Sequence, residues 1–464
     1  MSRLVVVSNR VATPGENRAG GLAVGLQAAL ARAGGVWFGW SGKVVREHSG
    51  RLHEQVDGDV RYVTMDLARR DHDDYYNGFA NRTLWPLLHS RLDLVDYARE
   101  TREGYLRVNS LFADRLAPLL RDDDVLWIHD YHLIPLARML HERGTGCRIG
   151  FFLHVPMPSA DLVSALPEHR RLFTTLYAYD LLGFQTARDA DRFRTYARIH
   201  GGASLDRDGT VRPPGGGRVV VDEFAIGIDA ARISEQSAAA VSKPAVRALR
   251  ESLSGRRLAI GVDRLDYSKG LPERFRAFGR YIERHPDQRG QLTFLQIAPV
   301  SRGDVSEYRH LRDQLEGIAG HINGTHAEPD WTPLRYVNRN FAHATLTGFY
   351  REAKVGLVTP LRDGMNLVAK EYVAAQDPED PGVLVLSMLA GAAIELDAAL
   401  LVNPYDLDGV ADAIARATVM PAGERRERWR AMMGPVAGND IHAWCDRFLK
   451  RLATIPGQAR GSRD

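Results

Sequence analysis

Cysteine is almost missing from this sequence, because only Cys147 and Cys445 occur among 464 residues. They lie far apart and in no spacing typical of a metal site, which excludes a disulfide framework and favours a reducing compartment. A run of about 18 apolar residues, as a membrane-spanning helix needs, is missing too. The first residues run directly into a short apolar strand and lack the pattern of a signal peptide. We therefore expect a cytoplasmic protein.

An excess of charge of one sign is also missing. The 61 basic residues nearly balance the 58 acidic ones, and the net charge is +3. This balance gives no electrostatic argument for nucleic acid or an anionic membrane, so we predict neither partner. Hydrophobic residues make up 44% and charged residues 26% of the chain, which indicates a globular protein with a substantial core. The length predicts two or three domains.

Motifs of several enzyme classes are absent. Gly-x-Ser-x-Gly does not occur, so nothing supports a Ser-His-Asp hydrolase. No Asp-x-Asp pair follows an apolar strand, and His129 and His132 lie on a predicted loop without a third ligand motif. We therefore predict no metal and no cofactor. Glycosidase chemistry needs two facing carboxylates, and Asp130 and Asp363 stay open as candidates because the sequence does not set their separation.

Strand-like apolar runs alternate with helix-like segments along the chain. This alternation predicts an α/β protein with parallel sheets covered on both faces. We place a domain boundary near residue 229, which gives two doubly wound domains facing a central cleft. Three smaller segments carry predictions of their own: a hairpin or excursion within Gly201–Gly217, a turn at Ile322–Gly324 and a flexible tail at 455–464.

The most informative stretch is Val355–Gln376. It begins as an apolar strand, breaks at Thr359-Pro360, passes through a polar turn and becomes a helix pattern from Asn366. A strand that ends in a glycine turn and opens a helix presents backbone N–H groups and a positive dipole end, which suits a phosphate. Glu371, one turn into the helix, is placed to accept hydrogen bonds from sugar hydroxyls. An ordinary strand–turn–helix unit is the alternative.

Two further loops fit the same chemistry. Arg264 and Lys269 lie between a predicted strand and a predicted helix, where a bidentate fork and a point charge suit a diphosphate. Such fixed charge would stabilise a departing nucleoside diphosphate without a metal. Near the N-terminus, the apolar strand Leu4–Val7 is followed by a glycine-rich loop that opens a helix at Gly20–Gly25. The alternatives are a solvated basic turn and an ordinary glycine loop.

Polar residues follow other strands of the first half, where open α/β sheets bind ligands. They include His129–His132 and the segment that begins at His154. The aromatic segment Asp71–Asp96, with Tyr76 and Trp85, shows neither helix nor strand period. It predicts a pocket wall, with a plain core cluster as the alternative.

Several motifs occur together and in order between about residues 2 and 450. They are Ser8-Asn9-Arg10, Gly20-Gly21-Leu22, Trp37-x-Gly39-Trp40, Tyr76-Asn77, Trp85-Pro86, His129-Asp130-Tyr131-His132-Leu133, His154-x-Pro156-x-Pro158, Gly227-Ile228-Asp229, Asp263-Arg264-Leu265-Asp266-Tyr267-Ser268-Lys269-Gly270 and Arg362-Asp363-Gly364-Met365-Asn366-Leu367-Val368. This set resembles the alpha,alpha-trehalose-phosphate synthases, glycosyltransferase family 20.

The resemblance implies a GT-B fold of two Rossmann-like domains. It assigns residues 1–229 to acceptor binding and 230–437 to the nucleotide sugar, with a C-terminal helix at about 438–454 crossing back onto the first domain. It implies transfer of glucose from UDP-glucose to the anomeric hydroxyl of glucose 6-phosphate, with retention. The family is thought to use front-face substitution, in which the leaving diphosphate takes the acceptor proton. We also expect a homo-oligomer.

The resemblance assigns roles to residues one by one. The acceptor-binding set is Arg10, Tyr76, Trp85, Asp130 and Arg302. The donor-binding set is Gly20, Gly21, Arg264, Lys269, Gly364, Met365, Asn366, Leu367, Val368 and Glu371. The catalytic set is His154, Arg264, Lys269 and Asp363.

Two alternatives stay open within this fold. One is a relative with another donor or acceptor, such as a glucosylglycerol-phosphate synthase or a pseudo-glycosyltransferase. The other is an inactive sugar-phosphate sensor. Small departures from the family pattern at Met388 and in the short loop around Arg18 concern donor preference and loop closure. The base of the nucleotide also stays open between UDP, GDP and ADP.

Overall fold

The computed structural model describes residues 2–14, 21–47, 50–300 and 306–456. The chain forms two compact units: the first runs to Ala225 and resumes at His442, and the second is Ile226–Ile441. Of the tail predicted at 455–464, residues 457–464 lie outside the described residues, whereas Ile455 is described and buried. No helix within the described ranges is long and apolar enough to cross a membrane.

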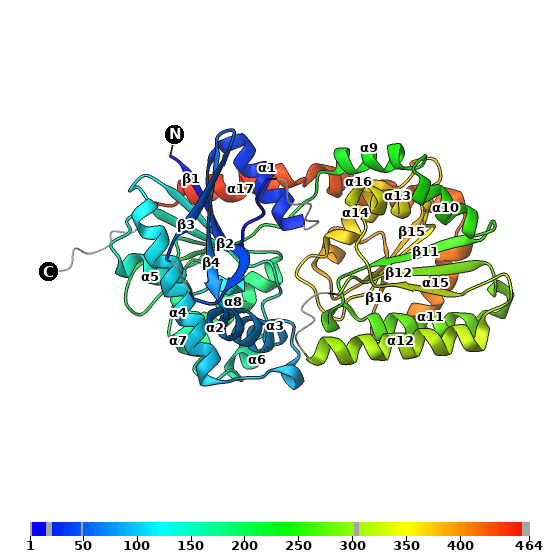
Figure 1. The fold of residues 1–464 in the computed structure, drawn as a ribbon, viewed down its shortest axis with the longest axis horizontal. Coiled ribbons are helices and arrows are strands. Elements are labelled where there is room, and N and C mark those ends of the chain that lie inside the picture. Colours follow the sequence, from blue (N-terminus) through cyan, green and yellow to red (C-terminus); the bar gives the residue numbers. More distant parts are fainter. Residues whose placement is uncertain (1, 15–20, 48–49, 301–305, 457–464) are drawn as a thin grey trace. The chain divides into compact units, whose positions relative to one another are not determined.

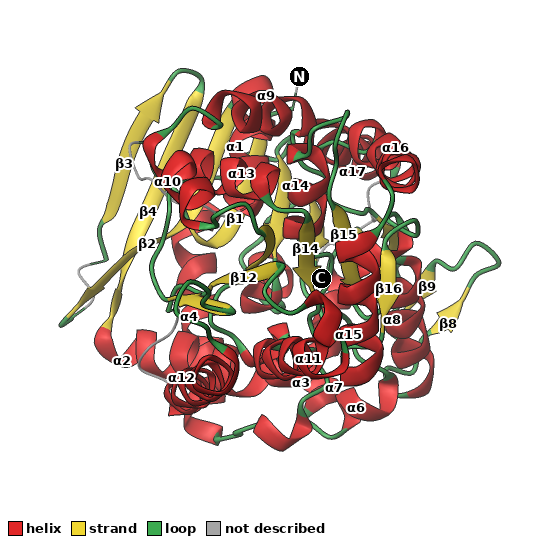
Figure 2. Ribbon diagram, turned by 90° about the vertical axis from the view of Figure 1, so that its right-hand side faces the viewer, coloured by secondary structure: helices red, strands yellow, loops and turns green. Residues whose placement is uncertain are grey.

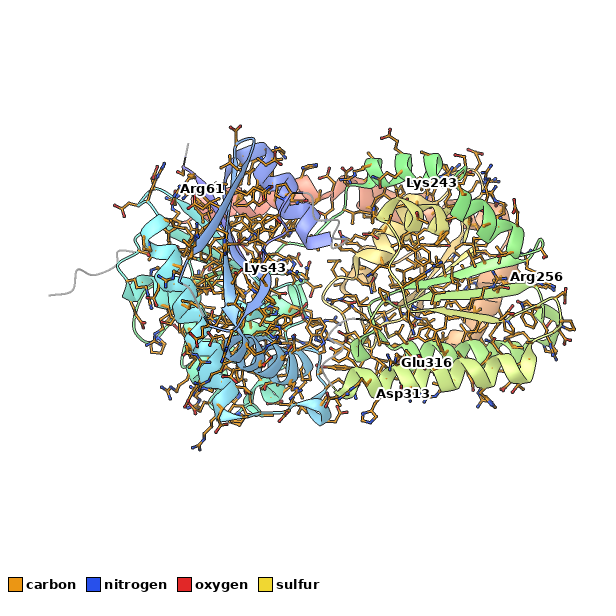
Figure 3. All side chains as sticks on the ribbon, viewed as in Figure 1. Lys43, Arg61, Lys243, Arg256, Asp313 and Glu316 are labelled. Atoms are coloured by element: carbon orange, nitrogen blue, oxygen red, sulfur yellow. The ribbon has the colours of Figure 1, made fainter. Side chains whose placement is uncertain are left out.

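The first unit is built on a mainly parallel sheet with the strand order β10-β7-β6-β5-β1-β2-β4-β3. Its strands are β1 (Leu4–Arg10), β2 (Gly35–Val45), β3 (Leu52–Asp57), β4 (Val60–Ala68), β5 (Val125–His129), β6 (Arg148–Phe152), β7 (Leu181–Phe184) and β10 (Val220–Glu223). The edge strand β3 is antiparallel to β4, and its exposed Glu54 pairs with Arg61 on β4, which is labelled in Figure 3. Because β3 is polar and mostly exposed, the sequence contains no apolar run that would predict this strand.

The helices of the first unit are α1 (Gly21–Ala33), α2 (Arg69–Asp71), α3 (Trp85–Leu88), α4 (Arg99–Leu116), α5 (Leu136–Glu142), α6 (Ala160–Ser164), α7 (His169–Phe173), α8 (Ala187–Ile199) and α17 (Ile441–Thr454). The hairpin predicted within residues 201–217 is confirmed as the antiparallel ribbon of β8 (Ser204–Leu205) and β9 (Val211–Arg212), visible in Figure 2.

Helix α17 packs on one face of this sheet through aromatic side chains. Phe448 stacks on Trp127 of β5 with ring centroids 4.7 Å apart. Gly150 and Gly183 make room for it, since a Cβ on either would lie 2.7 Å from the Phe448 ring. Successive residues of a strand face opposite sides of the sheet. Phe38 of β2 faces the side opposite to α17, and its ring packs on Phe112 of α4. The sheet is therefore covered on both faces.

The aromatic segment, which shows neither helix nor strand period in the sequence, is largely helical. Residues His72–Leu84 form a wide helix, η1, whose hydrogen bonds run from i to i+5. Its buried side chains include Tyr75, Phe79 and Leu84. Phe79 and Leu84 are five residues apart, which departs from the 3.6-residue period of an α-helix, so the periodicity did not reveal the element.

The second unit is a parallel sheet with the order β13-β12-β11-β14-β15-β16. Its strands are β11 (Arg257–Val262), β12 (Leu292–Ile297), β13 (Leu334–Val337), β14 (Val355–Val358), β15 (Val383–Ser387) and β16 (Leu400–Val402). Its helices are α9 (Ala230–Ala240), α10 (Pro244–Ser252), α11 (Leu271–Arg284), α12 (Ser306–His326), α13 (His343–Glu352), α14 (Leu367–Ala375), α15 (Leu407–Val419) and α16 (Ala422–Gly438). Figure 1 shows α11, α12 and α15 on one face of this sheet and α9, α13 and α14 on the other.

The turn predicted at Ile322–Gly324 is wrong, because these residues continue helix α12. The Asn323 side chain donates to the carbonyl of Leu334 at 2.8 Å and accepts from its N–H at 3.0 Å. Ile322 is buried and lies against Gly279. Tertiary contacts thus hold an Asn-Gly pair in a helix, although this pair favours turns in isolation.

Candidate active site

In the first unit, an arginine and a set of rings meet at the end of β1. Arg10 is the exposed last residue of the strand, and its guanidinium carbon lies 5.6 Å from the ring centroid of Trp40. Trp40 in turn lies 5.6 Å from the ring of Tyr76. Gly42 has φ +87°, and a Cβ there would lie 2.3 Å from the Arg10 guanidinium. Arg10 and Tyr76 were predicted from the sequence, whereas Trp40, which orients Arg10 by a cation–π contact, was not.

Behind this group, Tyr76 stacks on the buried ring of His132, with centroids 5.9 Å apart and planes 14° from parallel. The adjacent Tyr75 is fully buried and donates its hydroxyl to the side-chain oxygen of Asn9 at 2.8 Å. Burial raises the pKa of Tyr75 well above its ordinary value, so this hydroxyl keeps its proton. The ring of His132 and the uncharged Tyr75 therefore form a fixed support for Tyr76.

Asp130 and His154, which follow neighbouring strands, lie side by side as predicted for strand ends. The backbone N–H of His154 donates to Asp130 Oδ1 at 3.3 Å, and the N–H of Asp130 donates to the carbonyl of Phe152 at 2.8 Å. Asp130 has φ 75° and ψ 165°, a backbone region almost reserved for glycine. Such strain persists only where the surroundings impose it, and it gathers at functional sites.

The ring of His154 is hydrogen-bonded to a second histidine. His154 Nε2 lies 3.1 Å from Nδ1 of His129, the fully buried last residue of β5. Burial lowers the pKa of His154 to about 3, and burial together with His154 lowers the pKa of His129 well below its ordinary value. Both rings are therefore neutral at physiological pH. The sequence indicated His129 as a polar residue at a strand end and as part of a motif, but not as a partner of His154.

Trp85 begins α3 directly after η1 and is 5% exposed. Its ring packs on His89, with centroids 4.1 Å apart, and on Tyr131 at 5.7 Å. The structure thus places Trp85 mainly in the core, beside the residue that follows Asp130.

In the second unit, Lys269 and Asp363 form an ion pair between two strand-end loops. Their N···O distance is 2.5 Å, and both side chains are nearly buried. Asp363 Oδ2 also accepts from the amide of Asn366 at 3.0 Å. Arg264, two residues beyond β11, is exposed. The predicted basic loop and the predicted acidic turn therefore meet, with Lys269 already matched by a carboxylate.

The N-terminus of α14 has the geometry that the sequence predicted. Asn366 caps the helix by accepting from the N–H of Ala369 at 3.3 Å, and it has φ 75°. Leu367 and Val368, the first two helical residues, are half-buried. The N–H groups of this first turn point along the axis, where a phosphate is favoured.

The turn before α14 is held by close backbone packing. A Cβ on Gly391 would lie 1.9 Å from the carbonyl oxygen of Gly364. The carbonyl of Met365, whose side chain is buried, accepts from the N–H of Ala392 at 2.8 Å. Gly364 and Met365 are thus fixed in place by the 3₁₀ turn at Gly391–Ile394.

A buried arginine supports both loops. Arg274 is fully buried and donates to Asp263 at 2.5 Å, to Gln296 at 2.9 Å and to Thr359 at 2.9 Å. Asp263 and Thr359 directly follow β11 and β14, and Gln296 is the last residue but one of β12, so one side chain ties three strand ends together. Arg274 was not predicted from the sequence, although it lies on the face of α11 that carries Leu271, Phe275 and Phe278, which is a signal for a buried cation.

Glu371, on α14, is half-buried, and its carboxylate lies 3.8 Å from Nε2 of His343. The preceding residue, Lys370, is fully buried, pairs with Glu395 and donates to the carbonyl of Ile226 at 2.8 Å. The helix therefore points one acidic side chain outward from a tightly anchored turn.

Some predicted positions lie outside the described residues. These are Gly20, Arg302 and the loop around Arg18, while Gly21 is the first residue of α1. Within the described residues, no three His, Cys, Asp or Glu side chains are grouped so that they could hold a metal ion. The carboxylates left open for glycosidase chemistry lie in different units, Asp130 in the first and Asp363 in the second.

The sequence matches the model of glycosyltransferase family 20 over residues 3–454. The chain belongs to this family. A trehalose-6-phosphate synthase of Sinorhizobium fredii is 50% identical over 97% of this chain and 98% of its own length. A second one, from Klebsiella pneumoniae, is 50% identical over the whole of this chain and 98% of its own.

Solved structures of family 20 relatives agree. An alpha,alpha-trehalose-phosphate synthase (UDP-forming) of Burkholderia xenovorans, in complex with glucose-6-phosphate, has a TM-score of 0.95 and 50% identity, covering 97% of this chain and all of its own. An E. coli protein bound with UDP-2-fluoro glucose has a TM-score of 0.94 and 47% identity, covering 98% of this chain and all of its own. The predicted family and α/β GT-B fold class are confirmed.

Proposed function

We propose that this protein is a retaining glucosyltransferase that makes alpha,alpha-trehalose 6-phosphate and UDP from UDP-glucose and glucose 6-phosphate. Membership of family 20 along nearly the whole chain carries the proposal. The site geometry supports it, because each unit has a charged or hydrogen-bonding cluster at its strand ends, and the two clusters differ in the ligand that they suit.

The second unit takes the nucleotide sugar. The N-terminus of α14 and the loop carrying Arg264 and Lys269 offer positive charge to the diphosphate. The turn Asp363–Asn366 holds the glucose, Leu367 and Val368 contact the nucleoside side, and Glu371 accepts hydrogen bonds from the ribose. The Lys269–Asp363 pair supports this division, since it joins the loop proposed for the diphosphate to the turn proposed for the glucose.

The first unit takes the acceptor. Arg10 and Tyr76 bind the phosphate of glucose 6-phosphate. Arg302, a residue of the second unit that lies outside the described residues, is assigned to the same phosphate. Asp130 accepts hydrogen bonds from the acceptor sugar, while Trp85 shapes the wall beside it. Gly20, which lies outside the described residues, and Gly21 are assigned to the donor phosphates, and His154 is assigned to donate to a hydroxyl of the donor glucose. Arg10 supports the phosphate role, because it is exposed and held by Trp40.

The reaction is a front-face substitution without an enzyme nucleophile. The bond between C1 of glucose and the diphosphate oxygen breaks, and a bond from C1 to the acceptor oxygen forms on the same face. The acceptor proton passes to the departing phosphate oxygen, so UDP leaves. Arg264 and Lys269 stabilise the charge that develops on the diphosphate. Asp363 is hydrogen-bonded to two side chains, which fits a positioning task better than attack on C1.

A donor and acceptor panel tests this function. UDP release is measured with UDP-, GDP- and ADP-glucose, each with and without glucose 6-phosphate, and the product is identified by NMR. We expect release from UDP-glucose only with glucose 6-phosphate and an alpha,alpha-1,1 linkage. A different acceptor, or binding without turnover, would replace the proposal with a family relative or an inactive sensor respectively.

We also propose a cytoplasmic homo-oligomer. The two free cysteines are both buried, which suits a reducing compartment. Strand β16 is an edge of its sheet and exposes Leu401, and such an edge favours pairing with another chain. Light scattering of the purified protein tests this assembly, and a monomer at micromolar concentration would refute it.

A further inference from the structure

The histidine pair of the first unit contains one nitrogen with an informative environment. His129 is fully buried, and its Nδ1 is engaged with His154 Nε2 at 3.1 Å. Its other nitrogen, Nε2, is buried without a hydrogen-bond partner. A neutral imidazole carries one N–H and one lone pair, so the state of this nitrogen determines which ring donates in the pair.

The surroundings of His129 favour a lone pair on Nε2. The ring lies between Trp127, at a centroid distance of 4.6 Å, and Trp444, at 6.3 Å, with Phe152 at 6.4 Å. The indole nitrogens of both tryptophans are also buried without partners, and indole can only donate. An N–H on Nε2 would add a third unsatisfied donor to this group. Buried N–H groups without acceptors are rarer in proteins than acceptors that lack a donor.

With a lone pair on Nε2, the proton of His129 resides on Nδ1. The Nδ1–H then donates to His154 Nε2, and His154 must carry its own proton on Nδ1. His154 is partly exposed, and its ring is held between Phe152, at 4.6 Å, and Trp444, at 6.0 Å. Both the orientation of this ring and its tautomer are therefore fixed before any ligand binds.

We propose that His129 is a positioning residue that holds His154 as the Nδ1–H tautomer, so that His154 presents a hydrogen-bond donor to a hydroxyl oxygen of the bound sugar. The role of His154 toward sugar rests on the proposed function, whereas the tautomer does not. The lowered pKa values of the two rings agree with a neutral pair. His129 thus acts on the reaction only through His154.

The tautomer is measured directly by ¹⁵N NMR of the full chain labelled at histidine, without substrate. We expect the His154 signals of a neutral ring with protonated Nδ1 and unprotonated Nε2. Protonated Nε2 on His154, or a charged ring at pH 7, would overturn the proposal. Because no turnover is needed, this result is independent of whether the chain uses UDP-glucose.

Three variants connect the tautomer to activity. His129→Phe keeps a ring between Trp127 and Trp444 but removes the N–H that donates to His154. We expect a mixture of His154 tautomers and a fall in kcat of about tenfold. His129→Asn restores an N–H near the place of Nδ1 and recovers most of kcat. Trp444→Phe alters the packing around the same two histidine rings, and we expect it to leave the His154 tautomer unchanged.

The folded state of each variant is checked by circular dichroism before kinetics. A folded His129→Phe protein with the wild-type kcat would refute the positioning role. So would equal losses in His129→Phe and His129→Asn, since the rescue distinguishes a lost hydrogen bond from lost packing. If the wild type turns over no sugar nucleotide, the proposed function fails, and the tautomer measurement still decides the inference.

Discussion

The first unit places rings at the ends of its strands, whereas the second places ion pairs there. In the first, neutral side chains such as His129 and Tyr75 surround the few polar groups. In the second, Arg274 pairs with Asp263, and Lys269 pairs with Asp363. Ring stacks fix a shape at little electrostatic cost, whereas buried ion pairs fix charges and are expensive to break. This difference suits an uncharged sugar with one phosphate in the first unit and a diphosphate leaving group in the second.

The largest effect is expected where a buried ion pair of the second unit is broken. Arg274→Met leaves Asp263 buried without its cation and should lower the free energy of unfolding by about 3–5 kcal/mol. Urea unfolding measures this loss. The double variant Arg274→Met, Asp263→Leu should recover much of it, because no charge is left unpaired. A loss below about 1 kcal/mol for Arg274→Met would show that the pair is not a fixed part of the unit.

The next largest effect concerns the charge at the leaving group. Arg264→Ala should lower kcat by about 10²–10³-fold, as removal of one electrostatic partner of a transition state typically does. The matched control is Arg256→Ala, at the opposite end of the same strand and labelled in Figure 3, where we expect near-normal turnover. Equal kcat values for the two variants would remove Arg264 from the leaving-group role.

The neutral histidines of the first unit predict a pH dependence of stability. The pKa of His154 is lowered from 6.5 in the unfolded chain to about 3 in the folded one. Between these pH values the unfolded state binds more protons than the folded state, so acid destabilises the protein. The contribution of His154 to the free energy of unfolding is fully present above pH 6.5. Removing this group in His154→Asn should make the slope shallower by about 1.4 kcal/mol per pH unit. Chemical unfolding between pH 4 and 6 measures it, with Trp444→Phe as packing control; an unchanged slope would contradict a neutral ring.

The smallest effect is expected for a ring contact. Trp40→Leu removes the aromatic face beside Arg10 and should raise KM for glucose 6-phosphate about two- to fivefold, the range of an exposed cation–π contact. KM for UDP-glucose serves as the internal control in the same initial-rate matrix. A parallel rise in both constants would mean that Trp40 supports the fold of the unit and does not orient Arg10.

The buried strands were predictable because parallel strands covered on both faces read as continuous apolar runs. Leu4–Val7 and Val355–Val358 are such runs, and each lies in a strand of the structure. The cap at Asn366 was predictable for a similar reason, since its signal is local. The elements that were not predicted lack a local signal in the sequence. The residues of η1 do not follow the α-helical period, and β3 has no apolar run.

The supporting residues of the site were out of reach for a different reason. His129 and His154 are 25 residues apart, and only the pairing of β5 with β6 brings them together. Arg274 likewise binds residues at three strand ends, and only the order of the strands in the sheet brings these ends side by side. Motifs therefore indicated the groups that we assign to ligands, while the side chains that hold those groups became visible only in the fold.

The central claim is that the acceptor phosphate binds in the first unit and the nucleoside diphosphate in the second, and calorimetry of single ligands tests it most directly. UDP and glucose 6-phosphate are titrated separately into wild type, Arg10→Ala and Arg264→Ala. We expect Arg10→Ala to weaken glucose 6-phosphate at least tenfold and to leave UDP unchanged, and Arg264→Ala to show the reverse. Equal weakening of both ligands by either variant would contradict the division of the site between the two units.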